Sequence, residues 1–255
     1  MADLAIVGER GRRLLSAAPR VAASLIGAAG LLLVLVPFGW RFGLWHFRLS
    51  FRMVAWAQDL ALMAAAVAAI ALAFRRATIG ARERWLMATV IVAGLLVTYV
   101  PWQWAQLRGP RPPINDITTD SVHPPAFAAA LPGRAAEQAV SADYGGTAIA
   151  EQQRAAYPDI APLIVALPPA QEFERALAAA RAMRGWTILA SDAEAGRIEA
   201  SETTLYFGFT DDIVIRVTPG GTGSAVDVRS HSRQGRGDFG VNAARVRKYL
   251  AALKG

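Results

Sequence analysis

Three long apolar segments near the start of the chain limit its possible folds more than any other feature. Residues 21–40 carry no charge, and at about 1.5 Å per residue they can cross the ~30 Å hydrocarbon layer of a bilayer. Residues 53–74 and 85–104 are similarly long and apolar, and Asp59 is the one charged residue in them. Tryptophans lie near both ends of the last segment. The first segment is too long for the core of a signal peptide, and no A-x-A site follows it. We predict a membrane anchor over residues 1–108 with three transmembrane helices.

The positive charge of the chain is concentrated around these segments. Residues 1–108 contain twelve arginines and four acidic residues, a net charge of +8, although the whole chain carries only +7. The remainder contains fifteen basic and sixteen acidic residues and therefore has no general positive field. This distribution is typical of a membrane protein and argues against nucleic-acid binding.

The arginines also predict which way the anchor crosses the membrane. The two stretches expected on one side, residues 1–20 and 75–84, hold eight arginines. The other side, residues 41–52 together with Arg108 and Arg111, holds five. Positive residues favour the cytoplasmic side, so we expect a cytoplasmic N-terminus in a bacterial inner membrane. Three crossings then put the C-terminal domain in the periplasm.

Several kinds of chemistry are excluded by residue type and spacing. The chain contains no cysteine, which rules out disulfides, thiol catalysis and cysteine-bound metals. His46, His123 and His231 are far apart, and no metal-binding spacing occurs. The sequence therefore predicts no metal site and no cofactor.

Two features of the second apolar segment have a structural and a functional interpretation. Ala61, Ala65 and Ala69 recur every four residues, a spacing that lets helices approach closely. Asp59 is an acid within the segment. It is either part of a proton or ion pathway, as in a transporter subunit, or an acid near the interface that bonds to a neighbouring helix or to water. The second interpretation is favoured because only Gln58 is polar nearby.

The rest of the chain divides into a proline-rich arm, residues 109–169, and an α+β domain, residues 170–255. Prolines exclude long helices from the arm, where a short helix is expected near residues 135–140. The domain pattern predicts a two-layer antiparallel meander with two helices. The first helix covers residues 171–184, and the second starts at an N-cap, Asp238, and turns Val241, Val246, Tyr249, Leu250 and Leu253 inward. Strands are expected at 186–188, 197–201, 205–209, 213–217 and 226–228, with turns at Asp211–Asp212 and 219–221.

Three motifs of the arm and the domain carry a family resemblance. They are RPPINDITTD at 111–120, AYPDI at 156–160 and VDVRSHSRQGRGDFGVNAARV at 226–246. Their order resembles that in the bacterial family called domain of unknown function 1499, and the resemblance covers residues ~110–254. It supports the domain boundary and implies no reaction, cofactor or catalytic residue.

The last motif also predicts a candidate site. A strand, a turn with Gly235 and Gly237 and a helix N-terminus can present backbone N–H groups to an anion. The anion-binding residues would be Arg229, Arg233, Arg236, Asn242 and Arg245. In the alternative interpretation, the glycines only shape the turn, Asp238 only caps the helix, and the polar groups make structural bonds.

The leading functional hypothesis is an inner-membrane protein that displays a periplasmic binding or interaction domain. Its partners would be the lipid bilayer and an anionic ligand or an envelope protein. The alternative is an envelope hydrolase or lipid-modifying enzyme, with its site between residues 111–160 and the arginine turn. Ser230 and Ser232 flank His231 on a strand and point away from it, so they make no nucleophile–base pair. Acids of the arm can converge only if the fold brings them together: Asp116, Asp120, Asp143 and Asp159.

Overall fold

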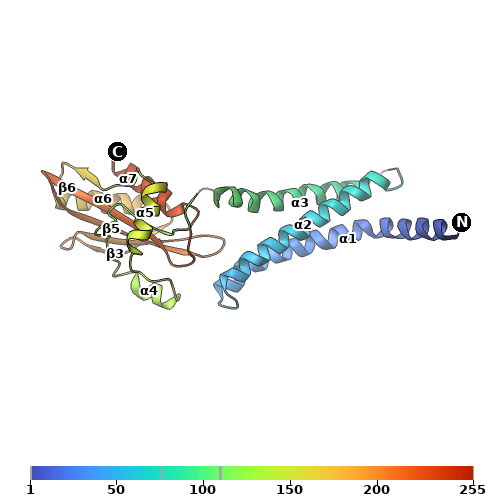
Figure 1. The fold of residues 1–255 in the computed structure, drawn as a ribbon, viewed down its shortest axis with the longest axis horizontal. Coiled ribbons are helices and arrows are strands. Elements are labelled where there is room, and N and C mark those ends of the chain that lie inside the picture. The colour runs from blue at the N-terminus through green and yellow to red at the C-terminus, as the bar shows by residue number, and fades with distance from the viewer. Residues whose placement is uncertain (1, 76, 109–110, 255) are drawn as a thin grey trace. The chain divides into compact units, whose positions relative to one another are not determined.

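The computed structural model describes residues 2–75, 77–108 and 111–254 (Figure 1). The chain divides into two compact units, Met1–Gly109 and Pro110–Gly255. The first unit contains three helices: α1 (Ala2–Arg41), α2 (Phe47–Arg75) and α3 (Ala81–Arg108). Within the described residues, Ser16–Arg41 and Phe47–Arg75 are long and apolar enough to cross a membrane. The third span, expected within α3, stays a prediction.

Small residues form the contact between α2 and α3. Gly94 of α3 lies so close to α2 that a Cβ atom there would be 2.5 Å from the Ala61 carbonyl oxygen and 2.9 Å from the Ala65 Cβ. Ala69, expected in the same stripe, is exposed, and Ala64 and Ala68 are buried instead. The stripe follows the helix repeat of about 3.6 residues and not a strict repeat of four.

The second unit is an α+β domain, which confirms the predicted fold class at this level. One antiparallel sheet has the order β1-β6-β5-β4-β3, and β2 also pairs with β6. Strands β3 to β6 form the predicted meander, whereas β1 and β2 come from the proline-rich arm. The elements in chain order are β1 (Asp116–Thr118), α4 (Leu131–Ala136), α5 (Gly146–Ala156), β2 (Leu163–Val165), α6 (Pro169–Ala182), β3 (Trp186–Asp192), β4 (Arg197–Thr203), β5 (Thr210–Gly220), β6 (Gly223–Ser232) and α7 (Val241–Lys254).

The predicted order of strand and turn between β4 and β5 is wrong. Residues 204–209, expected as a strand, form the connecting loop, and Asp211 and Asp212, expected as a turn, lie within β5. Both acids face β6, where Asp211 is opposite Ser232 and Asp212 is opposite His231. An Asp-Asp pair usually marks a turn, but here the two carboxylates point to opposite faces, and each meets an arginine there.

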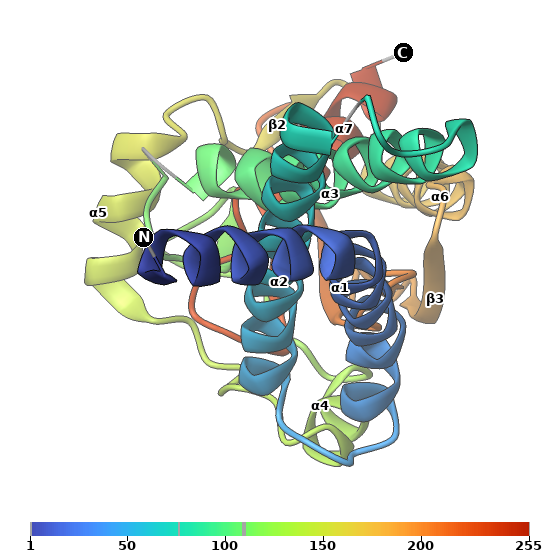
Figure 2. The ribbon, with the colours of Figure 1, turned by 90° about the vertical axis from the view of Figure 1, so that its right-hand side faces the viewer.

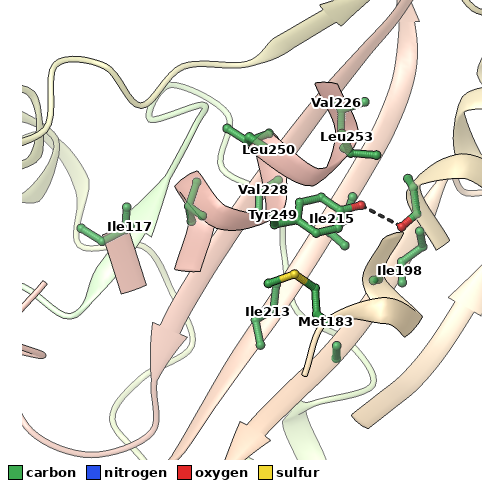
Figure 3. Packing of buried hydrophobic residues seen from close by; sticks show 14 of the residues in the cluster. Ile117, Met183, Ile198, Ile213, Ile215, Val226, Val228, Tyr249, Leu250 and Leu253 are labelled. Atoms are coloured by element: carbon green, nitrogen blue, oxygen red, sulfur yellow. Dashed lines mark hydrogen bonds between the residues drawn. The ribbon is translucent and has the colours of Figure 1, made fainter. Parts of the chain in front are cut away.

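Helices α6 and α7 cover one face of the sheet and form the hydrophobic core with it. Ile213 and Ile215 of β5 are fully buried against these helices, and Figure 3 shows them beside Tyr249 of α7. The Tyr249 hydroxyl donates a 2.9 Å hydrogen bond to the Ala176 carbonyl oxygen of α6, which joins the two helices. The predicted inward residues of α7 are buried except Val241, which is 46% exposed in the first turn.

The arm wraps the other sides of the sheet. Helix α5 lies along the β1 edge of the sheet, on the side opposite β3 in Figure 2. Gln153 of α5 accepts a hydrogen bond from the Thr118 N–H and donates one to the Thr118 carbonyl oxygen, which fixes the helix at this edge. The segment that contains α4 lies on the face opposite α6 and α7 (Figure 1). The short helix expected at 135–140 begins four residues earlier, and α5 was not predicted.

Candidate functional site

A buried polar layer covers the face of the sheet that α6 and α7 leave open. Because side chains alternate along a strand, Asp227, Arg229 and His231 of β6 lie on this face beside Asp212 and Arg216 of β5. Asp227 accepts hydrogen bonds from Arg216 across the strands, with Nη2 and Oδ2 2.7 Å apart. Arg229 lies on the same face as Asp227 but pairs with an acid of the arm, Asp116, which no sequence motif indicated.

Arg229 ties this face to the arm. Its Nε and Nη2 atoms each donate a 2.8 Å hydrogen bond to the Asp116 carboxylate of β1. It also donates hydrogen bonds to carbonyl oxygens of the arm, at Pro125 and Ala142. Burial raises the pKa of Asp116, although Arg229 and Arg134 oppose that shift. The Arg229 charge is therefore compensated inside the domain.

Asp212 is the centre of a second buried ion cluster. Its carboxylate is fully buried and accepts hydrogen bonds from Arg134 of α4 at 2.9 Å and from Arg233 at 2.7 Å. Arg233 also binds Glu137, at 2.6 Å. A Cβ atom on Gly133 would be 2.9 Å from the Arg233 guanidinium, so glycine lets α4 approach this cluster.

His231 lies between the two ion clusters and is neutral. Arg134 can only donate, so the His231 Nδ1 atom 3.4 Å away is the acceptor. The same Nδ1 atom lies 3.7 Å from the Asp116 carboxylate, but this contact is no ion pair. Burial, together with the charges of Arg134 and Arg229, lowers the pKa of His231 to about 2.

The remaining candidate residues lie on the opposite face or in solvent. Arg245 binds Asp211 and Glu202, each at 2.7 Å, on the side that α7 covers. Asn242 also lies on this side and is hydrogen-bonded to Ser230 and Ser232. The structure therefore separates Asn242 and Arg245 from Arg229 and Arg233, because alternate residues of β6 face opposite ways.

The turn between β6 and α7 holds the last two candidate residues. Asp238 accepts hydrogen bonds from the backbone N–H groups of Gly240 and Asn242 at the start of α7. Arg236 is exposed and makes no ion pair within the part of the chain that the structure describes. In the anchor, Asp59 is exposed on α2.

A pocket opens beside Arg229 and has a volume of about 310 Å³. The Arg229 guanidinium lies 4.9 Å from the Phe127 ring centre and 5.6 Å from that of Tyr144. Both rings belong to the arm, and the lining residues are Pro124, Ala126, Phe127, Leu131, Ala142, Asp143, Tyr144 and Arg229. The volume is at the lower end of small-molecule sites.

Tyr144 is the notable polar group of this pocket. Its hydroxyl oxygen is buried, and the described residues offer it no hydrogen-bond partner. Burial and the nearby charge of Asp116 raise the pKa of Tyr144 to about 12, so the hydroxyl keeps its proton at neutral pH. A buried hydroxyl without a hydrogen-bond partner is destabilising. No sequence motif distinguished Tyr144, because the pocket forms only when the arm folds over the sheet.

The acids of the arm do not converge. Asp116 pairs with Arg229, and Asp120 pairs with Arg216 at 2.9 Å. Asp159 binds Arg247 at the surface, and Asp143 accepts a hydrogen bond from Ser141. Among the described residues, no group of three or more histidines and acids could hold a metal ion.

Comparison with known proteins agrees with the motifs. A family model described as protein of unknown function (DUF1499) matches residues 116–253. This match confirms the resemblance that the motifs indicated. Neither the curated proteins nor the solved structures gave a match.

The Asp212 cluster should be essential for stability. In Asp212→Asn the buried Arg134 guanidinium loses its carboxylate partner and Arg233 keeps only Glu137, so we expect a loss of about 3–5 kcal/mol in unfolding free energy. Asp159→Asn is the control, because its pair with Arg247 is 55% and 44% exposed and should contribute at most about 1 kcal/mol. Urea unfolding of the detergent-solubilised chain measures both, followed by the change in tryptophan fluorescence, to which Trp186 is the contributor from residues 110–255. Equal small losses would contradict the assigned role of Asp212.

His231 should make the domain less stable in acid. The unfolded chain binds a proton at His231 near pH 6.5, whereas the folded chain does so only near pH 2. Between these values the unfolded state binds more protons, so stability falls as pH is lowered, by up to about 1.4 kcal/mol per pH unit. We expect His231→Gln to flatten this dependence between pH 6.5 and 4.5 in urea unfolding. His123→Gln, which alters an exposed residue, is the control, and an unchanged slope in His231→Gln would refute the assignment.

Proposed function

Because the chain belongs to the DUF1499 family of proteins of unknown function, membership supplies no reaction, and we propose a function from the structure. In this proposal the protein is a three-span protein of a bacterial inner membrane. Its α+β domain faces the periplasm and binds a small molecule in the pocket beside Arg229. The buried, unpartnered hydroxyl of Tyr144 is the observation that carries the binding proposal.

The chemistry of the pocket limits the ligand. The lining is mostly apolar and includes two aromatic rings, so the ligand would have a ring or a short apolar group. The Tyr144 hydroxyl needs a hydrogen-bond acceptor, such as a carbonyl, ether or carboxylate oxygen. Since Asp116 already compensates the Arg229 charge, the ligand does not have to be an anion.

An anion site at the turn between β6 and α7 is the second candidate. Its support is the exposed guanidinium of Arg236 beside two glycines and a helix start. Arg229, Arg233 and Arg245 each have a carboxylate partner, which favours a structural role for them. The enzyme alternative has less support, because the described lining residues include no serine, threonine, lysine or histidine.

Benzamide, which combines a ring with a carbonyl acceptor, is a suitable probe of the pocket. At ten times its Kd we expect it to stabilise the full chain by about 1.4 kcal/mol. Tyr144→Phe should weaken the binding of benzamide by about 0.5–1.5 kcal/mol, because it removes one hydrogen bond, and should therefore be stabilised less at the same benzamide concentration. Hydrogen exchange with and without benzamide should show protection of residues 124–144.

Two controls separate the candidate sites. Tyr206→Phe removes a hydroxyl far along the chain from the pocket and should respond to benzamide as the wild type does. Inorganic phosphate tests the turn, and Arg236→Ala is the matched variant. If phosphate stabilises the chain, Arg236→Ala abolishes that effect and benzamide has none, the binding site is at the turn and not in the pocket beside Arg229.

Cysteine labelling tests the proposed topology. The chain has no cysteine, and Thr222 is exposed in the turn between β5 and β6. In cells with a permeabilised outer membrane, we expect Thr222→Cys to react with a membrane-impermeant maleimide while the inner membrane is intact. Reaction only after lysis would put the domain in the cytoplasm and exclude three spans with a cytoplasmic N-terminus.

A further inference from the structure

The loop between β4 and β5, residues 204–209, presents apolar side chains to the outside. Leu205 is 93% exposed and Tyr206 is 42% exposed, whereas Phe207 is buried. Leu205 is more exposed than any other large apolar side chain among those of the described residues. A loop tip is usually polar, so this composition requires an explanation.

The loop has a defined conformation that keeps these side chains at its tip. The Thr204 N–H donates to the Phe209 carbonyl oxygen, and the Gly208 N–H donates to the Thr204 carbonyl oxygen, at 2.8 and 2.9 Å. Gly208 has a φ of +73°, which favours glycine. The ring of Phe207 stacks on that of Phe209, with ring centres 5.1 Å apart. The Tyr206 ring packs edge-on against the Phe207 ring, with centres 4.9 Å apart. The exposure of Leu205 is therefore part of an ordered loop.

The loop lies at the end of the sheet where the chain enters the domain. Thr203 and Thr210, which flank it, are paired, and the Thr210 carbonyl oxygen accepts from the Arg233 N–H. At the same level, the Ser232 N–H donates to the Asn115 carbonyl oxygen, next to β1. The first described residue of the domain, Arg111, is hydrogen-bonded to the Phe239 carbonyl oxygen. Only three residue steps separate Arg111 from Arg108, the last residue of α3.

The exposed charges at this end are mainly positive, and the exposed acid Glu137 is paired with Arg233. Arg111 and Arg236 are exposed, and Val241 adds a third exposed apolar side chain. The acids at this end are used internally. Asp211 and Glu202 bind Arg245, and Asp238 accepts the N–H groups at the start of α7. Apolar and cationic groups together, without free acids, suit a surface of anionic lipids.

We propose that this end of the domain docks on the bilayer that holds the anchor, with Leu205 and Tyr206 inserted at the interface. Leucine would reach the acyl region, and tyrosine would stay at headgroup level, where its ring and hydroxyl are both satisfied. The inference rests on the proposed function in one respect, because it requires α3 to be the third span. Docking would hold the Tyr144 pocket at a fixed orientation relative to the membrane.

Site-specific fluorescence on the full chain tests the docking. Leu205→Cys and Thr222→Cys are each labelled with an environment-sensitive nitrobenzoxadiazole dye. The two proteins are reconstituted into vesicles of phosphatidylethanolamine and phosphatidylglycerol, with and without a lipid that carries a nitroxide near its headgroup. Thr222 is the matched control, because it is an exposed turn residue at the opposite end of the same sheet.

We expect the label at position 205 to emit at shorter wavelength and to lose most of its emission to the nitroxide lipid, while iodide in the buffer hardly quenches it. The label at 222 should show the reverse. Iodide quenching of both labels alike would overturn the proposal, because the loop would then lie in water. Protection of position 205 from both quenchers would also overturn it, in favour of a protein partner or a second copy of the chain. Neither readout uses Tyr144 or depends on which side of the membrane the domain faces, so failure here is distinguishable from failure of the proposed function.

Discussion

Buried pairs of arginine and aspartate hold the arm on the open face of the sheet. Asp116 with Arg229, and Asp212 with Arg134 and Arg233, connect β1 and α4 to the two central strands. A buried charge without a partner is strongly destabilising. Each pair therefore fixes the position of the arm segment that carries one of its members, β1 through Asp116 and α4 through Arg134. Helices α6 and α7 cover the opposite face with an apolar core, and Asn242 and Arg245 of α7 add polar bonds at one end of it.

The same pairing limits what the arginine-rich motif can do. A guanidinium that already binds a carboxylate and a backbone carbonyl oxygen has few donors left for a ligand, as Arg229 illustrates. The arginines of the motif are therefore better explained as partners in buried ion pairs than as an open anion site. The free hydrogen-bonding capacity lies one layer further out, at Tyr144 in the arm. For this reason the site proposal rests on a residue of an irregular segment.

The sequence predicted those parts of the fold that depend on periodicity. The meander, α6, α7 and the glycine turn before β6 follow from alternation, helical spacing and turn residues, and the structure contains them. Periodicity failed where long-range contacts decide. Residues 204–209 alternate like a strand but form a loop. Asp211 pairs with Arg245 of α7 and Asp212 with Arg233 after the end of β6, and both arginines are more than twenty residues away in sequence. The pocket could not be predicted at all, because its two rings and Arg229 are brought together by the arm, whose path is set by partners about a hundred residues further along the chain.

The separation between β1 and β6 has a consequence for the order of assembly. Asp116 and Arg229 are 113 residues apart in sequence, and the strands β2 to β5 lie between β1 and β6. During synthesis β1 is the first strand of the domain to emerge, but it has no strand to pair with until β6 has been made. Contacts of such long range form slowly, and the unpaired strand is exposed in the meantime. The first strand of the domain to be made is therefore among the last to be paired, because the sheet cannot close at this edge before β6 exists.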